Sequence, residues 1–101
     1  MIKEILPSER ANKRLKAILS DNRVIHFGQK NGFTYIDEAD KTKRFNYHAR
    51  HMANYTEREL ITTLTPSPAL FSSIILWGKY KTIERNKDLL NKLFRMKQAI
   101  N

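Results

Sequence analysis

Residues 13–27 read KRLKAILSDNRVIHF, and this stretch decides how the N-terminal part of the chain folds. Leu15, Ala17 and Leu19 alternate with charged or polar neighbours, which is the period-2 pattern of a strand with one buried face. Ser20 to Arg23 supply turn residues, and the run VIHF follows them. The simplest interpretation of this pattern is a β-hairpin.

The segments on either side of the hairpin carry weaker signals. Gly28 ends the second strand, and after a loop the sequence FTYI, at Phe33–Ile36, could add a short third strand. Residues 1–12 are expected to form an N-terminal tail. Residues 13–36 then make up a β-hairpin region.

The first helix is expected to begin after Asp40, which stands where a helix N-cap accepts a backbone hydrogen bond. Phe45, Ala49 and Met52 are spaced by four and three residues, so they predict the buried face of this helix. The opposite face is expected to be exposed to solvent and to carry Lys43, Tyr47, Arg50 and Asn54.

Further helix signals follow along the chain. A capping box at Thr56–Glu59 predicts a short helix. Either Thr65-Pro66 or Ser67-Pro68 can cap the next segment, ALFSSIILW, which is apolar on nearly every side and should end at Gly78. Thr82 caps a last, amphipathic helix whose outer face is basic.

Together these signals predict an α+β fold, a small N-terminal antiparallel β-hairpin followed by three or four helices. We expect a single compact domain over residues 1–101, with its helical region at residues 40–98, because 101 residues suffice for one core and are too few for two. The apolar helix must be covered by its own domain or by a partner. A homodimer is therefore an open alternative.

The composition points to an acidic partner. The formal net charge is +9, from 19 Lys and Arg against 10 Asp and Glu, and the pI is near 10.0. The apolar content of 41% excludes a wholly disordered protein, and the lack of cysteine excludes disulfides and thiolate chemistry. The apolar runs are too short for a secretory signal or a membrane span, so we expect neither secretion nor contact with a membrane.

The best candidate for a working surface is KTKRFNYHARHMANYT, at Lys41–Thr56, which contains no acidic residue. Its cations alternate with aromatic rings, a mixture that can neutralise phosphates or carboxylates while the rings pack or stack. An ordinary solvated helix surface is the alternative. The residues predicted to bind nucleic acid or an acidic partner are Lys41, Lys43, Arg44, Tyr47, Arg50 and His51.

Two aromatic residues of the apolar helix are candidates for docking a protein. Phe71 and Trp77 would act as interface anchors if their rings are exposed. Simple packing in the core of their own domain is the alternative.

No motif points to catalysis. The sequence lacks a Gly-rich phosphate loop, a Ser-His-Asp arrangement and paired carboxylates in an apolar setting. We therefore expect no enzyme activity and no cofactor. A metal site built from His26, His48 and His51 is conceivable, but no carboxylate–histidine spacing supports it, and no metal is expected. His48 is expected to pack beside Phe45 with a ring nitrogen hydrogen-bonded.

Four short motifs carry a resemblance to a known family. They are I-H-F-G at Ile25–Gly28, A-R-H at Ala49–His51, I-L-W-G-K at Ile75–Lys79 and T-I at Thr82-Ile83. In this order they resemble a family of short basic proteins of unknown function encoded by large DNA viruses, and similar patterns occur in some tailed-phage proteins. The resemblance spans residues 13–94. The chain departs from the pattern by an extra residue near Asn31 and by a shorter stretch after His51.

The resemblance implies a viral origin, and two functional hypotheses extend it. In the first, the chain is a non-enzymatic structural protein of the virion, a minor capsid or internal nucleoprotein component that docks on other virion or capsid proteins and on acidic surfaces or packaged DNA. In the second, it is a free nucleic-acid-binding protein whose basic helix makes largely sequence-independent phosphate contacts. Both hypotheses place the protein in the virion or inside the host cell, in the cytoplasm or nucleus.

Overall fold

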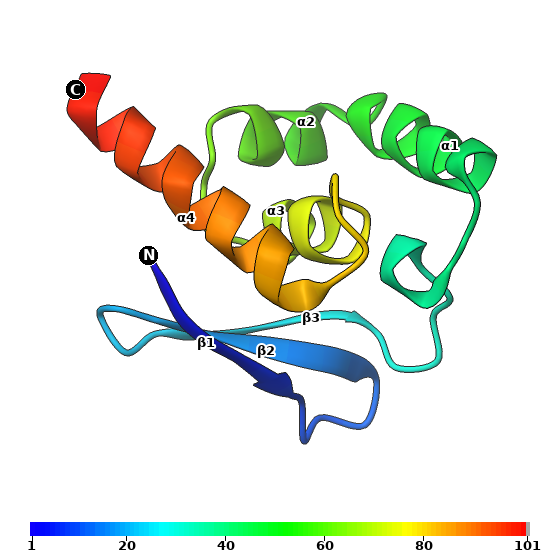
Figure 1. Cartoon of the computed structure of the whole chain (residues 1–101), viewed down its shortest axis with the longest axis horizontal. Coiled ribbons are helices and arrows are strands. Elements are labelled where there is room, and N and C mark those ends of the chain that lie inside the picture. Colours follow the sequence, from blue (N-terminus) through cyan, green and yellow to red (C-terminus); the bar gives the residue numbers. More distant parts are fainter. Residues whose placement is uncertain (101) are drawn as a thin grey trace.

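The computed structural model describes residues 1–100 as an antiparallel sheet followed by helices (Figure 1). The strands are β1 (Ile2–Pro7), β2 (Lys13–Leu19) and β3 (Val24–Gln29), in the spatial order β1-β2-β3. The helices are α1 (Lys41–Met52), α2 (Tyr55–Thr62), α3 (Pro68–Phe71) and α4 (Ile83–Ile100). A 3-10 turn, η1 (Tyr35–Asp37), precedes α1, and a π-helical stretch, η2 (Ser72–Leu76), continues α3. The predicted α+β fold and the hairpin are confirmed.

The predicted N-terminal tail at residues 1–12 is wrong, because Ile2–Pro7 forms strand β1 beside β2. Ile2 is only 4% exposed, and its backbone N–H and carbonyl bond to the Asn91 side chain of α4 at 2.8 and 3.0 Å. The pairing shifts register between Ile2 and Glu4. A bulged strand does not show the simple period-2 pattern, and this is why the sequence did not reveal it.

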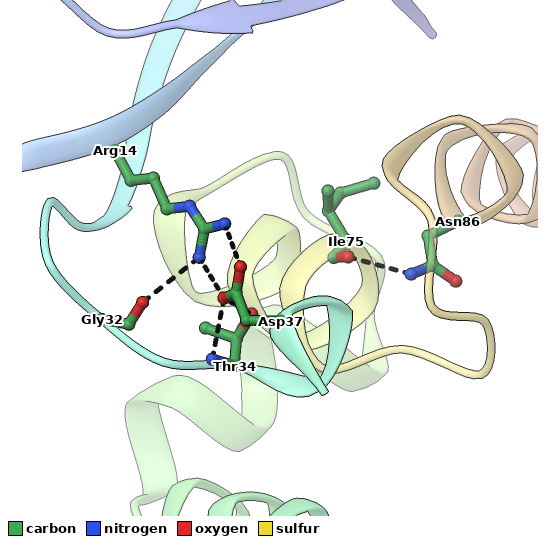
Figure 2. Close-up of polar contacts among 6 residues, drawn as sticks. All are labelled: Arg14, Gly32, Thr34, Asp37, Ile75 and Asn86. Atoms are coloured by element: carbon green, nitrogen blue, oxygen red, sulfur yellow. Dashed lines mark hydrogen bonds and ion pairs between the residues drawn. The ribbon is translucent and has the colours of Figure 1, made fainter. Parts of the chain in front are cut away.

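The possible third strand at Phe33–Ile36 is also wrong, because the chain turns there into η1. One carboxylate oxygen of Asp37 accepts hydrogen bonds from the backbone N–H of Thr34 at 2.9 Å and from its hydroxyl at 2.8 Å. Arg14 of β2 donates to both carboxylate oxygens of Asp37, at 2.6 and 2.7 Å, and to the carbonyl of Gly32 at 3.3 Å (Figure 2). These hydrogen bonds hold the segment from Gly32 to Asp37 against Arg14 of β2, in place of a third strand of the hairpin region.

The pair of Arg14 and Asp37 makes the stability depend on acid pH. Hydrogen bonds from Arg14, and then those from Thr34, lower the pKa of Asp37 from its ordinary 3.8 to about 2. Because the folded-state pKa is the lower one, the stabilisation is complete above about pH 4 and is lost as the pH falls toward 2. The carboxylate is 27% exposed, so water screens the pair, and we expect a loss of only about 1 kcal/mol.

Urea unfolding at pH 2 to 5 measures this effect, with Asp37→Asn as the comparison. The variant should be less stable than the unmodified protein at pH 5, and this difference should shrink toward pH 2. An equal difference at every pH would contradict the role of the Asp37 charge.

The apolar segment formed by α3 and η2 lies at the centre of the molecule, between the sheet and the pair α1 and α2 (Figure 1). Leu70, Phe71 and Ile75 have no exposed surface, and the Phe71 ring packs on Phe27 of β3 with 5.6 Å between centroids. The docking role predicted for Phe71 is therefore wrong, since its own domain covers it. Within residues 1–100, no helix combines the length and apolarity needed to cross a bilayer.

Most of the predicted helix caps are confirmed. The side chains of Asp40, Ser67 and Thr82 each accept a hydrogen bond from the backbone N–H three residues on, at 2.8, 3.2 and 3.3 Å. The capping box at Thr56–Glu59 is wrong, because α2 begins at Tyr55. Its cap is Asn54, whose side-chain oxygen accepts the N–H of Glu57 at 3.0 Å.

A fully buried asparagine anchors the connection between η2 and α4. Asn86 donates to the carbonyls of Ile75 at 2.9 Å and of Tyr80 at 2.8 Å, and it accepts from the N–H of Tyr80 at 2.9 Å. Figure 2 shows its bond to Ile75. These bonds satisfy backbone groups that water cannot reach, and they hold the residues just after η2 in place.

Candidate nucleic-acid interface

An open groove of about 1080 Å³ lies between the end of the sheet and the helices α1, α2 and α3. One wall comes from β2, β3 and the loop that follows β3, and it includes Lys13 and Phe33. The other wall comes mainly from α1, which contributes Lys43, Asn46, Tyr47, Arg50 and His51. The groove therefore joins residues that are far apart in sequence.

The charge around the groove is positive. Lys13, Lys43 and Arg50 line it, and none of them forms an ion pair within the described residues 1–100. One carboxylate, that of Glu57, also lines the groove, and it accepts a hydrogen bond from His51 Nδ1 at 2.5 Å. Three cations that form no ion pair among the described residues thus line the groove, and its acidic side chain, Glu57, is hydrogen-bonded to His51.

Stacked rings of Tyr47 and Trp77 line part of the groove. Their centroids are 4.5 Å apart and their planes differ by 8°, and the His51 ring lies 4.1 Å from Tyr47. Burial, and then the negative charge of Glu57, raises the pKa of Tyr47 to about 12, so the phenol stays neutral at physiological pH. The prediction that Tyr47 lies on a solvent face is wrong, and Trp77 is partly buried against it.

Helix α1 turns a different face inward than its apolar spacing predicts. Phe45 is 71% exposed and Ala49 is exposed, whereas Arg44 and His48 point at the end of η2. Arg44 Nε donates to the carbonyls of Trp77 at 3.1 Å and of the next residue at 3.0 Å. The carbonyls at the C-terminal end of a helix have no hydrogen-bond donor within that helix. At the end of η2, side chains of α1 supply the donors.

His48 completes this attachment. Its Nε2 lies 2.8 Å from the Trp77 carbonyl, which can only accept, so Nε2 carries the proton and donates it. Burial is the main cause that lowers the pKa of His48, which favours the neutral ring. The predicted hydrogen bond of a ring nitrogen is confirmed, whereas Phe45, beside which His48 is expected to pack, is 71% exposed.

The predicted binding residues divide into two groups. Lys43, Tyr47, Arg50 and His51 line the groove together with Trp77. The others do not line it. Lys41 is exposed, Arg44 holds α1 to the carbonyls after η2, and Phe71 is in the core.

Sequence reasoning missed the sheet side of the groove. The sequence pattern assigns Lys13 only to a strand and Phe33 only to a possible third strand, although Phe33 closely follows a turn at Lys30 and Asn31. An aromatic residue directly after such a turn was the one available signal.

His26 lies on the sheet, whereas His48 and His51 both lie on α1 beside Tyr47. His26 Nδ1 is 2.7 Å from the Ser8 hydroxyl on the sheet, while His48 and His51 make the contacts described above. Within residues 1–100, no three His, Asp or Glu side chains gather as metal ligands would.

Comparisons with known proteins relate the chain to uncharacterised ones. A family described as a family of unknown function (DUF5754) matches residues 3–51, which include the sheet, the η1 loop and nearly all of α1. The chain is also similar to Uncharacterized protein L851 of Acanthamoeba polyphaga mimivirus, with 35% identity over 79 residues that cover 73% of this chain and 79% of that protein. No solved structure matches the chain.

Proposed function

We propose that this chain, which belongs to a family of unknown function with a relative in a large DNA virus, is a viral protein that binds nucleic acid in the groove. The predicted resemblance to a family of unknown function in large DNA viruses is confirmed, while the basic character of that family and the likeness to tailed-phage proteins stay predictions. The observation that carries the proposal is the set of unpaired cations around the groove, Lys13, Lys43 and Arg50.

These cations approach the groove from different sides. Lys13 comes from the sheet, whereas Lys43 and Arg50 come from α1 and are seven residues apart, which is about 10 Å along a helix axis. They can therefore reach different phosphates of one strand. Neutralising several phosphates releases counterions and supplies affinity without regard to base sequence.

Planar and amide side chains favour nucleic acid over an acidic protein as the occupant. Asn12, Gln29 and Asn46 line the groove beside the aromatic rings, and amides can bond to sugars, bases and phosphate oxygens. Aromatic rings add stacking, which an acidic protein surface does not use. In this proposal the protein acts by binding alone, without catalysis or a cofactor.

The alternative hypothesis of a virion component relied on Phe71 and Trp77 as exposed residues that dock another protein, and neither residue now supports it. Phe71 is fully buried and Trp77 stacks on Tyr47 within the same chain. Four other expectations stay predictions: a place in the virion, contacts with other virion proteins, a location in the cytoplasm or nucleus, and a homodimer. Each is compatible with binding nucleic acid.

Removing the three groove cations tests the proposal. In the triple variant Lys13→Gln, Lys43→Gln and Arg50→Gln, we expect affinity for a fluorescent oligonucleotide at 0.1 M salt to fall about 100-fold. The slope of log affinity against log salt should become smaller by about 2, since three phosphates lose their cations. Fluorescence anisotropy at several salt concentrations measures both quantities.

A matched control variant distinguishes the loss of the groove cations from a general loss of positive charge. The control removes the same number of charges from exposed positions that do not line the groove, with the substitutions Arg10→Gln, Lys92→Gln and Arg95→Gln. The affinity of this variant for the oligonucleotide should fall much less. Arg44 is left unchanged in both variants because it holds α1 in place. Equal losses in the two variants, or an unchanged affinity in the groove variant, would refute the proposal.

A further inference from the structure

We propose that the groove takes a single strand of nucleic acid, with one unpaired base stacked on the ring of Phe33. This inference rests on the proposed function, because it names the form of nucleic acid that the same groove binds. It starts from Phe33, an apolar side chain that the groove exposes to solvent.

Phe33 is 58% exposed at the groove, although it is one of the largest apolar side chains in the protein. Lys43 Nζ lies over its ring, 5.7 Å from the ring centre, in a cation–π contact. A flat apolar face next to a cation matches one nucleotide of a single strand, whose base stacks on a ring while its phosphate meets a positive charge.

The loop that displays Phe33 is anchored on both sides. The carbonyl of Gly32 accepts a bond from Arg14 at 3.3 Å, and the N–H of Thr34 donates to Asp37 at 2.9 Å (Figure 2). Arg14 and Asp37 are themselves joined by two hydrogen bonds. Because the backbone is already held, little conformational entropy is lost when a base packs against the ring.

A duplex would use this site poorly. Its base faces are stacked on their neighbours, so presenting one to Phe33 would require the base to be flipped out at a cost of a few kcal/mol. The groove cations also line a hollow between the sheet and α1, whereas reading a duplex major groove requires an element that projects into it. A flexible single strand can enter the hollow with its phosphates toward the cations.

The test compares two exposed phenylalanines. Phe33→Ala should weaken binding of an oligothymidylate about 10-fold, the loss expected for one base stack, and should leave the salt dependence unchanged. Phe45→Ala is the matched control, because Phe45 is 71% exposed but does not line the groove, and it should bind like the unmodified protein. A duplex with the same number of phosphates should bind more weakly than the oligothymidylate, with no difference between Phe33→Ala and the unmodified protein.

The outcomes separate this inference from the proposed function. If both nucleic acids bind, the groove cations are required and Phe33→Ala changes nothing, the single-strand inference is wrong and the proposed function stands. A loss of single-strand binding in Phe45→Ala as large as that in Phe33→Ala would also overturn the inference. If neither nucleic acid shows salt-sensitive binding, the proposed function fails and the inference fails with it.

Discussion

Gly78→Ala should leave the protein without a stable native state. A Cβ on Gly78 would lie 1.9 Å from the carbonyl oxygen of Ile74 and 3.0 Å from Asn86 Oδ1. The closer contact is with the backbone of the helical segment that carries the core, so no change of rotamer can relieve it. We expect a cost of about 4 kcal/mol or more, which is close to the whole stability of many small domains.

Circular dichroism and urea unfolding measure this effect. Gly32→Ala is the control, because a Cβ there would lie 3.3 Å from the Gln29 carbonyl oxygen, a contact that a small shift relieves, and we expect a cost of about 1 kcal/mol or less. If Gly78→Ala unfolds at nearly the same urea concentration as the unmodified protein, the close approach of residue 78 to Ile74 is refuted.

Phe71→Ala should destabilise the protein by about 4 kcal/mol, because it removes a fully buried ring and leaves a cavity in the core. Its ring packs on Phe27 of β3 and thereby joins α3 to the sheet. In a domain of about this length, such a loss lowers the melting temperature by roughly 20 °C. Partial unfolding of this variant at room temperature would be the same result.

Two further variants keep this prediction testable if Phe71→Ala does not fold. Phe71→Leu should remain folded at an intermediate stability, since it keeps part of the buried volume. Phe45→Ala should change the stability by less than about 0.5 kcal/mol, because Phe45 is 71% exposed. A folded Phe71→Ala variant of unchanged stability would contradict the core position and would revive the docking hypothesis.

Much of the fold could be predicted because its signals are local. The alternation in β2, the turn at Ser20–Arg23 and the caps at Asp40 and Ser67 each depend on residues within a few positions of one another. Strand β1 could not be predicted in this way, because what defines it is pairing with β2 and bonding to Asn91 of α4.

The candidate site was predicted only on its helical side. Lys43 and Arg50 were found because they belong to a basic run with no acid in it. Lys13 and Phe33 lie outside that run, and only the packing of the sheet against the helices brings them to the same groove. Tyr47 was assigned to the wrong environment because its partner, Trp77, is thirty residues further along the chain.

The sequence by itself determined the hairpin, most of the caps, the apolar central segment and the positive charge, because periodicity, capping and composition act within short stretches of chain. The tertiary structure decided which face of α1 turns inward and that a groove exists. The physical reason lies in the carbonyls of Trp77 and Gly78 after η2, which need donors, and Arg44 and His48 of α1 supply them. These hydrogen bonds, and not the apolar spacing of Phe45 and Ala49, decide the orientation of α1, so both of those residues are exposed. The same orientation places Lys43 and Arg50 at the groove.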